Sequence, residues 1–294
     1  EDLAPDPGEL EELCFRLKER LDEERRRVQV GGYSAHGVLA RIGRIDRLVV
    51  VGDIHGDLES LEKVLSTADL TRGVPEGCLL VFLGDYVDRG EASLQVVYTV
   101  FKLKLENSGS TVLLRGNHEG PPQLPVYPHD FPTRLQKAYG DRWLNLYEAV
   151  TGCFSRLYAC ALLEGALFLV HGGVPTSRRG LDDLSKAEGP LLEELLWNDP
   201  MEECGCAPSP RGAGFLFGPD ITDSFLKGIG AKAVIRSHEP CNEGYRVSQS
   251  GRVLTVFSRK GYPYFNSYGA YLDIRKPHHI EGANQLAEGY IKKF

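Results

Sequence analysis

Two residues able to bind a metal ion or move a proton follow an apolar run near residue 50. The run Leu48–Val51 is typical of a buried strand, and after Gly52 the chain continues with Asp53 and His55. A buried strand has no structural need for a carboxylate and an imidazole at its end. Their position therefore indicates a binding or catalytic role.

Four further apolar runs end in polar side chains of the same kinds. These runs cover residues 78–83, 110–115, 166–170 and 232–236. The polar residues that follow them include Asp85, Asp88, Arg89, Asn117, His118, Glu119, His171 and His238. Because the carboxyl ends of the strands in an open α/β sheet share one edge, we expect these side chains to lie close together.

Six of these side chains form a set of oxygen and imidazole ligands without a thiolate: Asp53, His55, Asp85, Asn117, His171 and His238. Such ligands suit hard or borderline divalent ions such as manganese, iron and zinc. Six ligands exceed the need of one ion, and a shared carboxylate can bridge two. Two ions about 3.5–4 Å apart clamp the oxygens of a phosphate group. The set therefore predicts a two-metal site for phosphate chemistry.

The segments between the apolar runs predict the architecture that positions these residues. Residues 58–70 and 92–108 have helical spacing and separate the first three runs. Strands that alternate with helices predict βαβ units in a sheet covered on both faces. Residues 245–258 and 269–275 indicate antiparallel strands and a second sheet. The expected fold class is therefore α/β with mixed sheets.

The N-terminal residues predict an amphipathic helix. Leu10, Leu13, Leu17 and Leu21 recur at helical spacing, and Asp6 before Pro7 is typical of an N-cap. We expect residues 1–34 to form a helical segment that packs on the body of the fold. Residues 35–294 would then form a single catalytic domain.

The composition limits which binding partners and which cellular compartment we expect for this protein. The net charge of −7 argues against nucleic acid as the main partner. No stretch approaches the roughly 20 apolar residues of a membrane span, and the acidic N-terminus does not fit a signal peptide. Seven cysteines without a regular framework fit a reducing compartment, so a cytoplasmic location is expected. The isolated pair Cys204 and Cys206 favours a structural or incidental role over metal binding or redox chemistry.

Three motifs, taken in order, resemble the signatures of the phosphoprotein phosphatase branch of the calcineurin-like metallophosphoesterases. They are GDIHGD (52–57), GDYVDRG (84–90) and GNHE (116–119). The likeness continues through HGG (171–173), LLWNDP (195–200), PRGAGFLFG (210–218), RSHE (236–239) and FSRKGY (257–262). It covers about residues 35–275, which is most of the chain. The resemblance implies a β-sandwich of mixed sheets flanked by helices, with a dimetal site at the carboxyl ends of strands.

The resemblance also implies a role for each matching residue. One ion would be held by Asp53, His55 and Asp85, and Asp85 would bridge to a second ion held by Asn117, His171 and His238. A hydroxide between the two metals would attack phosphorus directly. His118, oriented by Asp88, would protonate the leaving oxygen. The phosphate would be bound by Arg89 and Arg211, with Arg236 and Tyr262 as further candidates. Manganese is the expected metal, and an iron and zinc pair is the alternative.

The chain departs from the eukaryotic members of that branch in two places. Ser258-Arg-Lys-Gly-Tyr262 stands where those members have Ser-Ala-Pro-Asn-Tyr, which adds two cations at the mouth of the site. These cations favour acidic or phosphate-rich substrates. The proline-rich residues 121–132 also differ, so groove-based recognition is not carried over. No calmodulin-binding or autoinhibitory segment is evident after residue 275. The combination favours a prokaryotic or archaeal member that acts without a regulatory subunit.

The resemblance therefore favours a metal-dependent serine/threonine phosphatase acting on phosphorylated proteins. Activity on phosphotyrosine is left open. A hydrolase of the same superfamily that acts on nucleotides, such as a dinucleoside tetraphosphate hydrolase, is the nearest alternative. A third alternative is a non-catalytic scaffold with this fold. It is disfavoured because every predicted metal ligand and the predicted acid are present.

Overall fold

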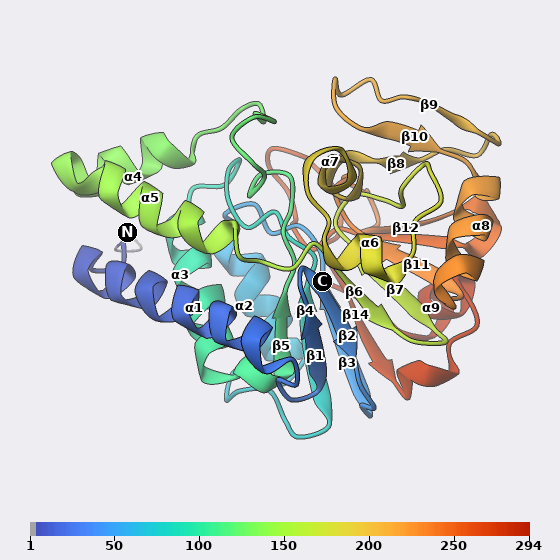
Figure 1. Cartoon of the computed structure of the whole chain (residues 1–294). Coiled ribbons are helices and arrows are strands. Elements are labelled where there is room, and N and C mark those ends of the chain that lie inside the picture. Colours follow the sequence, from blue (N-terminus) through green and yellow to red (C-terminus); the bar gives the residue numbers. More distant parts are fainter. Residues whose placement is uncertain (1–3) are drawn as a thin grey trace.

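Two β-sheets lie face to face at the centre of the molecule, and helices cover their outer faces (Figure 1). The computed structural model describes residues 4–294. The larger sheet has seven strands, in the order β1 (Tyr33–His36), β2 (Leu39–Ile42), β6 (Cys160–Leu163), β7 (Leu167–Val170), β11 (Ala233–Arg236), β13 (Val253–Val256) and β12 (Tyr245–Ser248). The smaller has five, in the order β15 (Ile291–Lys293), β14 (Ala270–Arg275), β3 (Arg47–Val51), β4 (Cys78–Phe82) and β5 (Thr111–Leu113). A separate small sheet contains β8 (Asp199–Pro200), β10 (Phe215–Phe217) and β9 (Cys206–Pro208).

The helices divide between the two outer faces. The five-stranded sheet is covered by α1 (Pro7–Arg27), α2 (Leu58–Thr67), α3 (Ser93–Glu106), α4 (Phe131–Tyr139) and α5 (Trp143–Phe154). The outer face of the seven-stranded sheet packs against α6 (Leu181–Ser185), α7 (Gly189–Trp197) and α8 (Pro219–Ile229). Residues of α9 (Ala283–Gly289) join the core between the sheets.

The side chains of β3 show how one strand serves two layers. Leu48 and Val50 lie in the core between the sheets, whereas Val49 and Val51 lie in the core beneath the helices. Successive side chains of a strand point to opposite faces, so a strand buried on both faces needs apolar residues throughout. This requirement explains the unbroken apolar run, and the expected α/β class with mixed sheets is confirmed.

The polar strand ends come from two sheets and not from the single edge that the sequence suggested. Strands β3, β4 and β5 are parallel neighbours in the five-stranded sheet. Strands β7 and β11 are parallel neighbours in the seven-stranded sheet. The isolated bridge between Asp53 and Phe257 joins the ends of the two sheets. The predicted ligands therefore meet at the junction of the sandwich.

Helix α1 forms as the sequence predicts. The carboxylate of Asp6 accepts hydrogen bonds from the backbone N–H groups of Gly8 and Glu9, at 2.8 and 3.0 Å. The four predicted leucines are buried against the helical layer. The division of the chain after residue 34 stays a prediction, and residues 1–3 lie outside the described part. Among residues 4–294, no helix combines the length and apolar composition that a membrane crossing requires.

A buried polar cluster fastens α1 to the sheet. The Nζ atom of Lys104 in α3 donates to Glu24 Oε1 of α1 and to the hydroxyl of Tyr33, both at 2.6 Å. It also donates to the carbonyl of Thr111 at 2.9 Å. All of these residues are buried. Because the ammonium group has no access to water, its stability in the fold depends on these acceptors.

We predict that Lys104→Met lowers the free energy of unfolding by about 3–5 kcal/mol, because it leaves the Glu24 carboxylate buried without its partner. The matched control is Lys102→Met, an exposed lysine on the same helix, which should change it by less than about 0.5 kcal/mol. Urea unfolding measures both. Equal effects of the two substitutions would show that the cluster does not hold α1 in place.

Candidate metal centre and active site

The structure brings the six predicted metal ligands together at one end of the sandwich. Asp53, Asp85, Asn117, His171 and His238 each follow the end of a different strand, and His55 lies two residues beyond Asp53. All six are buried, with exposed fractions between 0 and 6%. All but His171 line a cavity of about 410 Å³. The cavity therefore has a floor of potential metal ligands.

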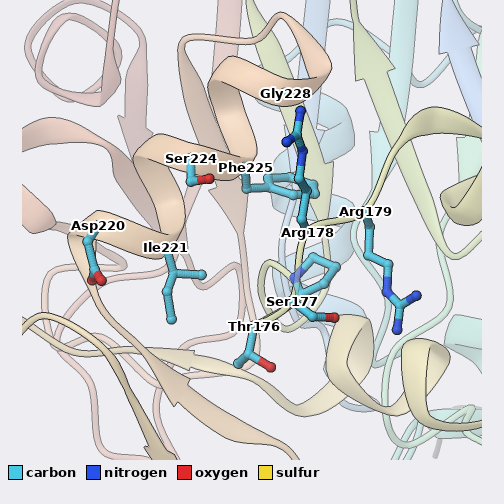
Figure 2. A pocket seen from close by; sticks show the side chains of 10 residues that line it. Thr176, Ser177, Arg178, Arg179, Asp220, Ile221, Ser224, Phe225 and Gly228 are labelled. Atoms are coloured by element: carbon cyan, nitrogen blue, oxygen red, sulfur yellow. The ribbon is translucent and has the colours of Figure 1, made fainter.

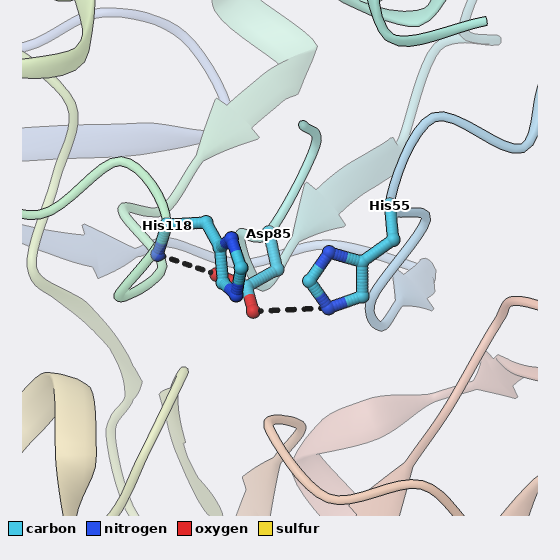
Figure 3. Close-up of side chains that lie close together, drawn as sticks. All are labelled: His55, Asp85 and His118. Carbon is cyan, nitrogen blue, oxygen red and sulfur yellow. Dashed lines mark hydrogen bonds and ion pairs between the residues drawn. The ribbon is translucent and has the colours of Figure 1, made fainter. Parts of the chain in front are cut away.

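The first ligand group surrounds the Nε2 atom of His55. This atom lies 3.3 Å from Asp85 Oδ2 (Figure 3). It also lies 3.7 Å from Asp53 Oδ2. The other ring nitrogen, Nδ1, donates to the carbonyl of Val87 at 2.8 Å. A carbonyl can only accept, so this contact fixes the tautomer and leaves the lone pair of Nε2 directed at the carboxylates. His55 is therefore prepared to bind a cation together with Asp53 and Asp85.

The second ligand group surrounds the side chain of Asn117. Its Oδ1 atom lies 3.0 Å from His171 Nε2 and 3.1 Å from His238 Nδ1. Asp85 Oδ1 lies 3.5 Å from the same His171 nitrogen. The Nδ1 atom of His171 faces the carbonyl of Leu83 at 3.2 Å, which again leaves Nε2 as the acceptor. Asp85 therefore contributes one carboxylate oxygen to each group.

The donor chemistry of this second group fits a cation. Oδ1 of Asn117 faces acceptor atoms, and only the reversed amide would donate hydrogen bonds to His171, His238 and Asp85. Lone pairs that point at one another repel unless a proton or a cation lies between them. A divalent ion satisfies all of them at once, with the amide oxygen as a ligand. Two overlapping clusters that share Asp85 can hold metal, which matches a two-ion site.

Burial shifts the protonation of these ligands toward their neutral forms. It raises the pKa of Asp53 to about 6 and raises the pKa of Asp85, to which the charge of Asp53 also contributes. It lowers the pKa of His55, His171 and His238. Neutral imidazole is the form that binds metal. Because burial disfavours the two carboxylate charges, a bound cation would supply the positive charge that they lack.

His118 lies beside the first ligand group and is held by Asp88. Its Nδ1 donates to Asp88 Oδ2 at 2.6 Å, and its ring packs edge-on against His55 with centroids 4.7 Å apart. A second imidazole, that of His129, lies 2.9 Å from the same oxygen. Burial alone would raise the pKa of Asp88, but the hydrogen bonds from the two imidazoles hold it below its usual range.

His118 is also close enough to the first ligand group to be a ligand itself. With His55 and Asp85 it forms one of the clusters that could hold an ion. Its backbone N–H donates to Asp85 Oδ1 at 3.0 Å (Figure 3). The geometry alone therefore allows a metal ligand or a proton donor at this position, and a variant that separates the two roles is required.

Of the four predicted phosphate-binding residues, the structure brings Arg89 and Arg211 to the cavity. Arg211 Nε donates to Asp199 Oδ2 at 2.6 Å, which orients its guanidinium. Arg89 Nη2 donates to the carbonyl of Tyr127 at 2.8 Å. Both leave further N–H groups for a ligand.

The structure does not place Arg236 or Tyr262 as the resemblance implied. Arg236 is fully buried, and its N–H groups donate to Gly172 O, Glu239 and Asp199 at 2.6–2.7 Å. It shares the acceptor Asp199 with Arg211, and it does not line the metal cavity. Tyr262 is 72% exposed and lines a different cavity. Tyr264 lies in the metal cavity instead, stacked on His55 with centroids 5.8 Å apart.

Glu119 is a supporting residue to which the sequence assigned no role. Its carboxylate accepts hydrogen bonds from the backbone N–H groups of Asp85, Tyr86 and Gly116, at 2.7, 2.9 and 3.1 Å. It therefore joins the loops after β4 and β5. Burial raises its pKa to about 7 despite these bonds. The position of Glu119 in the GNHE motif indicated that it could have a role. The motif alone does not show which groups it binds.

Ser237 is a second supporting residue of this kind. Its hydroxyl accepts from the backbone N–H of Asp53 at 2.8 Å and donates to the Asp53 carboxylate. It therefore links the end of β11 to the first ligand. Ser237 follows Arg236 in the RSHE motif. The sequence assigned roles to the arginine and the histidine of this motif and none to the serine.

Several residues in the loops of this site have a strained backbone. His55, Asp85, Asp88, Arg89 and His238 all have positive φ angles, between 45° and 71°. Side-chain-bearing residues rarely adopt this region, and such strain gathers at functional sites. Backbone N–H groups of Asp85 and Asp53 donate to Glu119 and Ser237, which hold two of these loops in place. The fold therefore keeps costly conformations where the ligands need them.

Comparison with known proteins agrees with this geometry. The sequence model described as calcineurin-like phosphoesterase matches residues 46–242. A serine/threonine phosphatase from Saccharomyces cerevisiae, described as similar to human phosphatase PP5, shares 24% identity and a TM-score of 0.76, over 98% of this chain and 90% of that one. A cold-active protein-tyrosine phosphatase of Shewanella sp. shares 16% identity and a TM-score of 0.55, over 79% and 76%.

A third structure, named as a candidate diadenosine tetraphosphatase, shares 16% identity and a TM-score of 0.50, over 87% of this chain and 96% of that one. At these identities the three structures establish the fold and not the substrate. The family match covers most of the chain and every predicted ligand from Asp53 to His238. The chain therefore belongs to the calcineurin-like phosphoesterase family.

Proposed function

We propose that this chain is a metal-dependent protein serine/threonine phosphatase that hydrolyses phosphomonoesters without a phospho-enzyme. The observation that supports this most is the His118–Asp88 pair beside a cavity lined by five of the six predicted metal ligands. A serine or threonine alkoxide is a poor leaving group, so its departure needs a proton. The presence of His118 in the wall of this cavity supports its assignment as the proton donor.

The proposed ligand sets are those of the two groups. Asp53, His55 and Asp85 would hold one ion, and Asn117, His171 and His238 would hold a second ion, with Asp85 available to both. Two divalent ions, manganese by preference or iron and zinc, supply an activated water and neutralise phosphate charge when bound. The buried, strained loops keep the ligands in place before the ions bind, which limits the reorganisation needed at the site.

The remaining groups handle the phosphate and the proton. Nε2 of His118 holds the proton that passes to the leaving oxygen, while Asp88 keeps Nδ1 protonated and fixes the ring. Arg89 and Arg211, which come from motifs far apart in the sequence, bind the phosphate oxygens. Their planar, paired donors suit this task. Tyr264 and Trp197 also line the cavity.

The substrate assignment is tested by comparing three substrates under the same metal conditions. We expect turnover of a phosphoserine peptide to exceed that of a phosphotyrosine peptide and of a dinucleoside tetraphosphate. Preference for the dinucleotide would favour the nucleotide hydrolase instead. Lack of turnover on all three, with metal bound, would favour the non-catalytic scaffold.

Replacement of the proposed acid separates its role from that of a ligand. We predict that His118→Asn lowers kcat on a phosphoserine peptide by about 10²–10⁴-fold. Both metal equivalents should remain. Activity on an aryl phosphate, whose leaving group needs less protonation, should fall less. The control His279→Asn, at an exposed histidine, should leave all of these values unchanged. Loss of one metal equivalent in the His118 variant would show that His118 is a metal ligand.

The shared carboxylate makes a separate prediction. Asp85→Asn removes the charge that both ions need, so elemental analysis should find at most one bound metal per chain where the unmodified protein has two. The control Asp141→Asn changes an exposed carboxylate and should retain both. Two tightly bound metals in the Asp85 variant would rule out the bridging role.

A further inference from the structure

A second cavity, of about 630 Å³, lies beside the metal cavity and shares Arg89 with it. Its walls come from the start of α2, the residues after β4, the start of α4 and the loop after β13. Arg259, Lys260 and Tyr262 line it from that last loop. This explains the position of Tyr262, which belongs to the second cavity and not to the first.

Arg259 is a buried cation without a carboxylate partner among residues 4–294. It is 5% exposed, and its Nη atoms donate to the carbonyls of His55 and Tyr262. Its guanidinium lies 5.6 Å from the ring centre of Tyr264. The Nε atom is buried without any hydrogen-bond partner in the same part of the chain. A buried charge is costly unless a counter-charge is present, so this wall favours an anion.

Arg89 and Lys260 add to the positive charge around Arg259. Arg89 Nε is buried and, among the described residues, has no hydrogen-bond partner. Within residues 4–294 its side chain donates a hydrogen bond to the neutral carbonyl of Tyr127. Lys260 is exposed, and its Nζ lies 5.9 Å from the ring centre of Tyr268. Neither cation is paired with a carboxylate within the described residues.

The acidic residues of this cavity are engaged or solvated. Asp130 accepts from Arg134 at 3.0 Å. Asp57 caps α2 by accepting from the backbone N–H and hydroxyl of Ser60, at 3.0 and 2.6 Å. Glu59 and Glu91 are exposed, so water screens their charges. Asp57 therefore leaves one partly buried negative charge on this wall, and the three cations Arg259, Arg89 and Lys260 outnumber it.

The position of the second cavity relative to the metal cavity defines which groups of a substrate could bind in it. Arg259, which lines the second cavity, donates to the backbone of His55, which lines the first, so the two cavities adjoin there. Arg89 lines both. A peptide residue spans at most about 3.6 Å, so an extended chain whose phosphoserine occupies the first cavity places a neighbour within reach of the second.

We propose that the second cavity binds another anionic group of the substrate, a carboxylate or a phosphate, on Arg259 with Arg89 and Lys260 alongside. The inference rests on the proposed function and names its substrate class. These substrates are phosphopeptides with an acidic or phosphorylated residue within a few positions of the scissile phosphoserine. Charge-assisted hydrogen bonds to a partly buried guanidinium supply the selectivity.

The test compares kcat/KM for three phosphoserine peptides that differ at one flanking position, which carries asparagine, aspartate or a second phosphoserine. A series places this position from two residues before to three residues after the scissile group. For the unmodified protein we expect a preference for the anionic peptides over the asparagine peptide of about 10-fold or more at the best position. The preference should shrink as salt is added. The relative rates of the aspartate and phosphoserine peptides show which anion is preferred.

Variants then assign the preference to the cavity. Arg259→Gln should reduce the ratio toward one. Lys260→Glu, at an exposed position that the fold does not depend on, should lower it severalfold even if the Arg259 variant fails to fold. The matched control is Arg178→Gln, which removes an exposed arginine from a smaller cavity beside α8 (Figure 2) and should retain the ratio.

Two failures are distinguishable. If phosphopeptides are hydrolysed at equal rates whatever the flanking residue, or if Lys260→Glu keeps the full preference, the second anion site is refuted and the phosphatase assignment stands. If no phosphopeptide is hydrolysed while a dinucleoside tetraphosphate is, the proposed function is refuted and the inference with it.

Discussion

The Asp85 carboxylate, buried between two groups of lone-pair donors, is the constraint on which the rest of this structure depends. One oxygen faces His55 and the other faces His171, and almost none of the residue is exposed. Carboxylates and imidazoles gathered in this way repel or desolvate one another unless a cation is present. The fold therefore stabilises an arrangement that is unfavourable by itself and useful only with bound cations.

Hydrogen bonds between the loops of the surrounding structure oppose that cost. Glu119 joins the loops after β4 and β5, and Ser237 joins the ends of β3 and β11. Gly116 lies so close to Asp85 that any side chain there would overlap the carboxylate. Because these contacts span both sheets, the position of the ligands depends on the packing of the whole sandwich.

Much of this arrangement could be predicted because it depends on local pattern. Apolar runs of four to six residues mark the strands, and the residues just after them are the ligands. Long-range geometry could not be predicted in the same way. Strands β7 and β11 belong to a different sheet from β3. This division follows from packing, and the spacing of residues in the sequence does not indicate it. Residue type alone also does not show which partners a side chain has. Arg236 has the donors that suit a phosphate, but Asp199 and Glu239 accept hydrogen bonds from them.

The aromatic residues of the loop after β13 show the same limit. Tyr262 and Tyr264 differ by two positions and are chemically identical, so sequence alone could not decide which one lines the metal cavity. The conformation of the loop decides it. Arg259, buried beneath Tyr264, contacts the backbone of both His55 and Tyr262, and so separates one tyrosine from the other. Loop conformation is thus what divides the metal cavity from the second cavity.

The central claim is that two ions share Asp85 between the two ligand groups, and diffraction at the manganese absorption edge from crystals grown with manganese tests it most directly. We expect two anomalous peaks about 3.5–4 Å apart, one contacted by Asp53 and His55, the other by Asn117, His171 and His238, with Asp85 touching both. A single peak, or two peaks that do not share Asp85, would contradict the account.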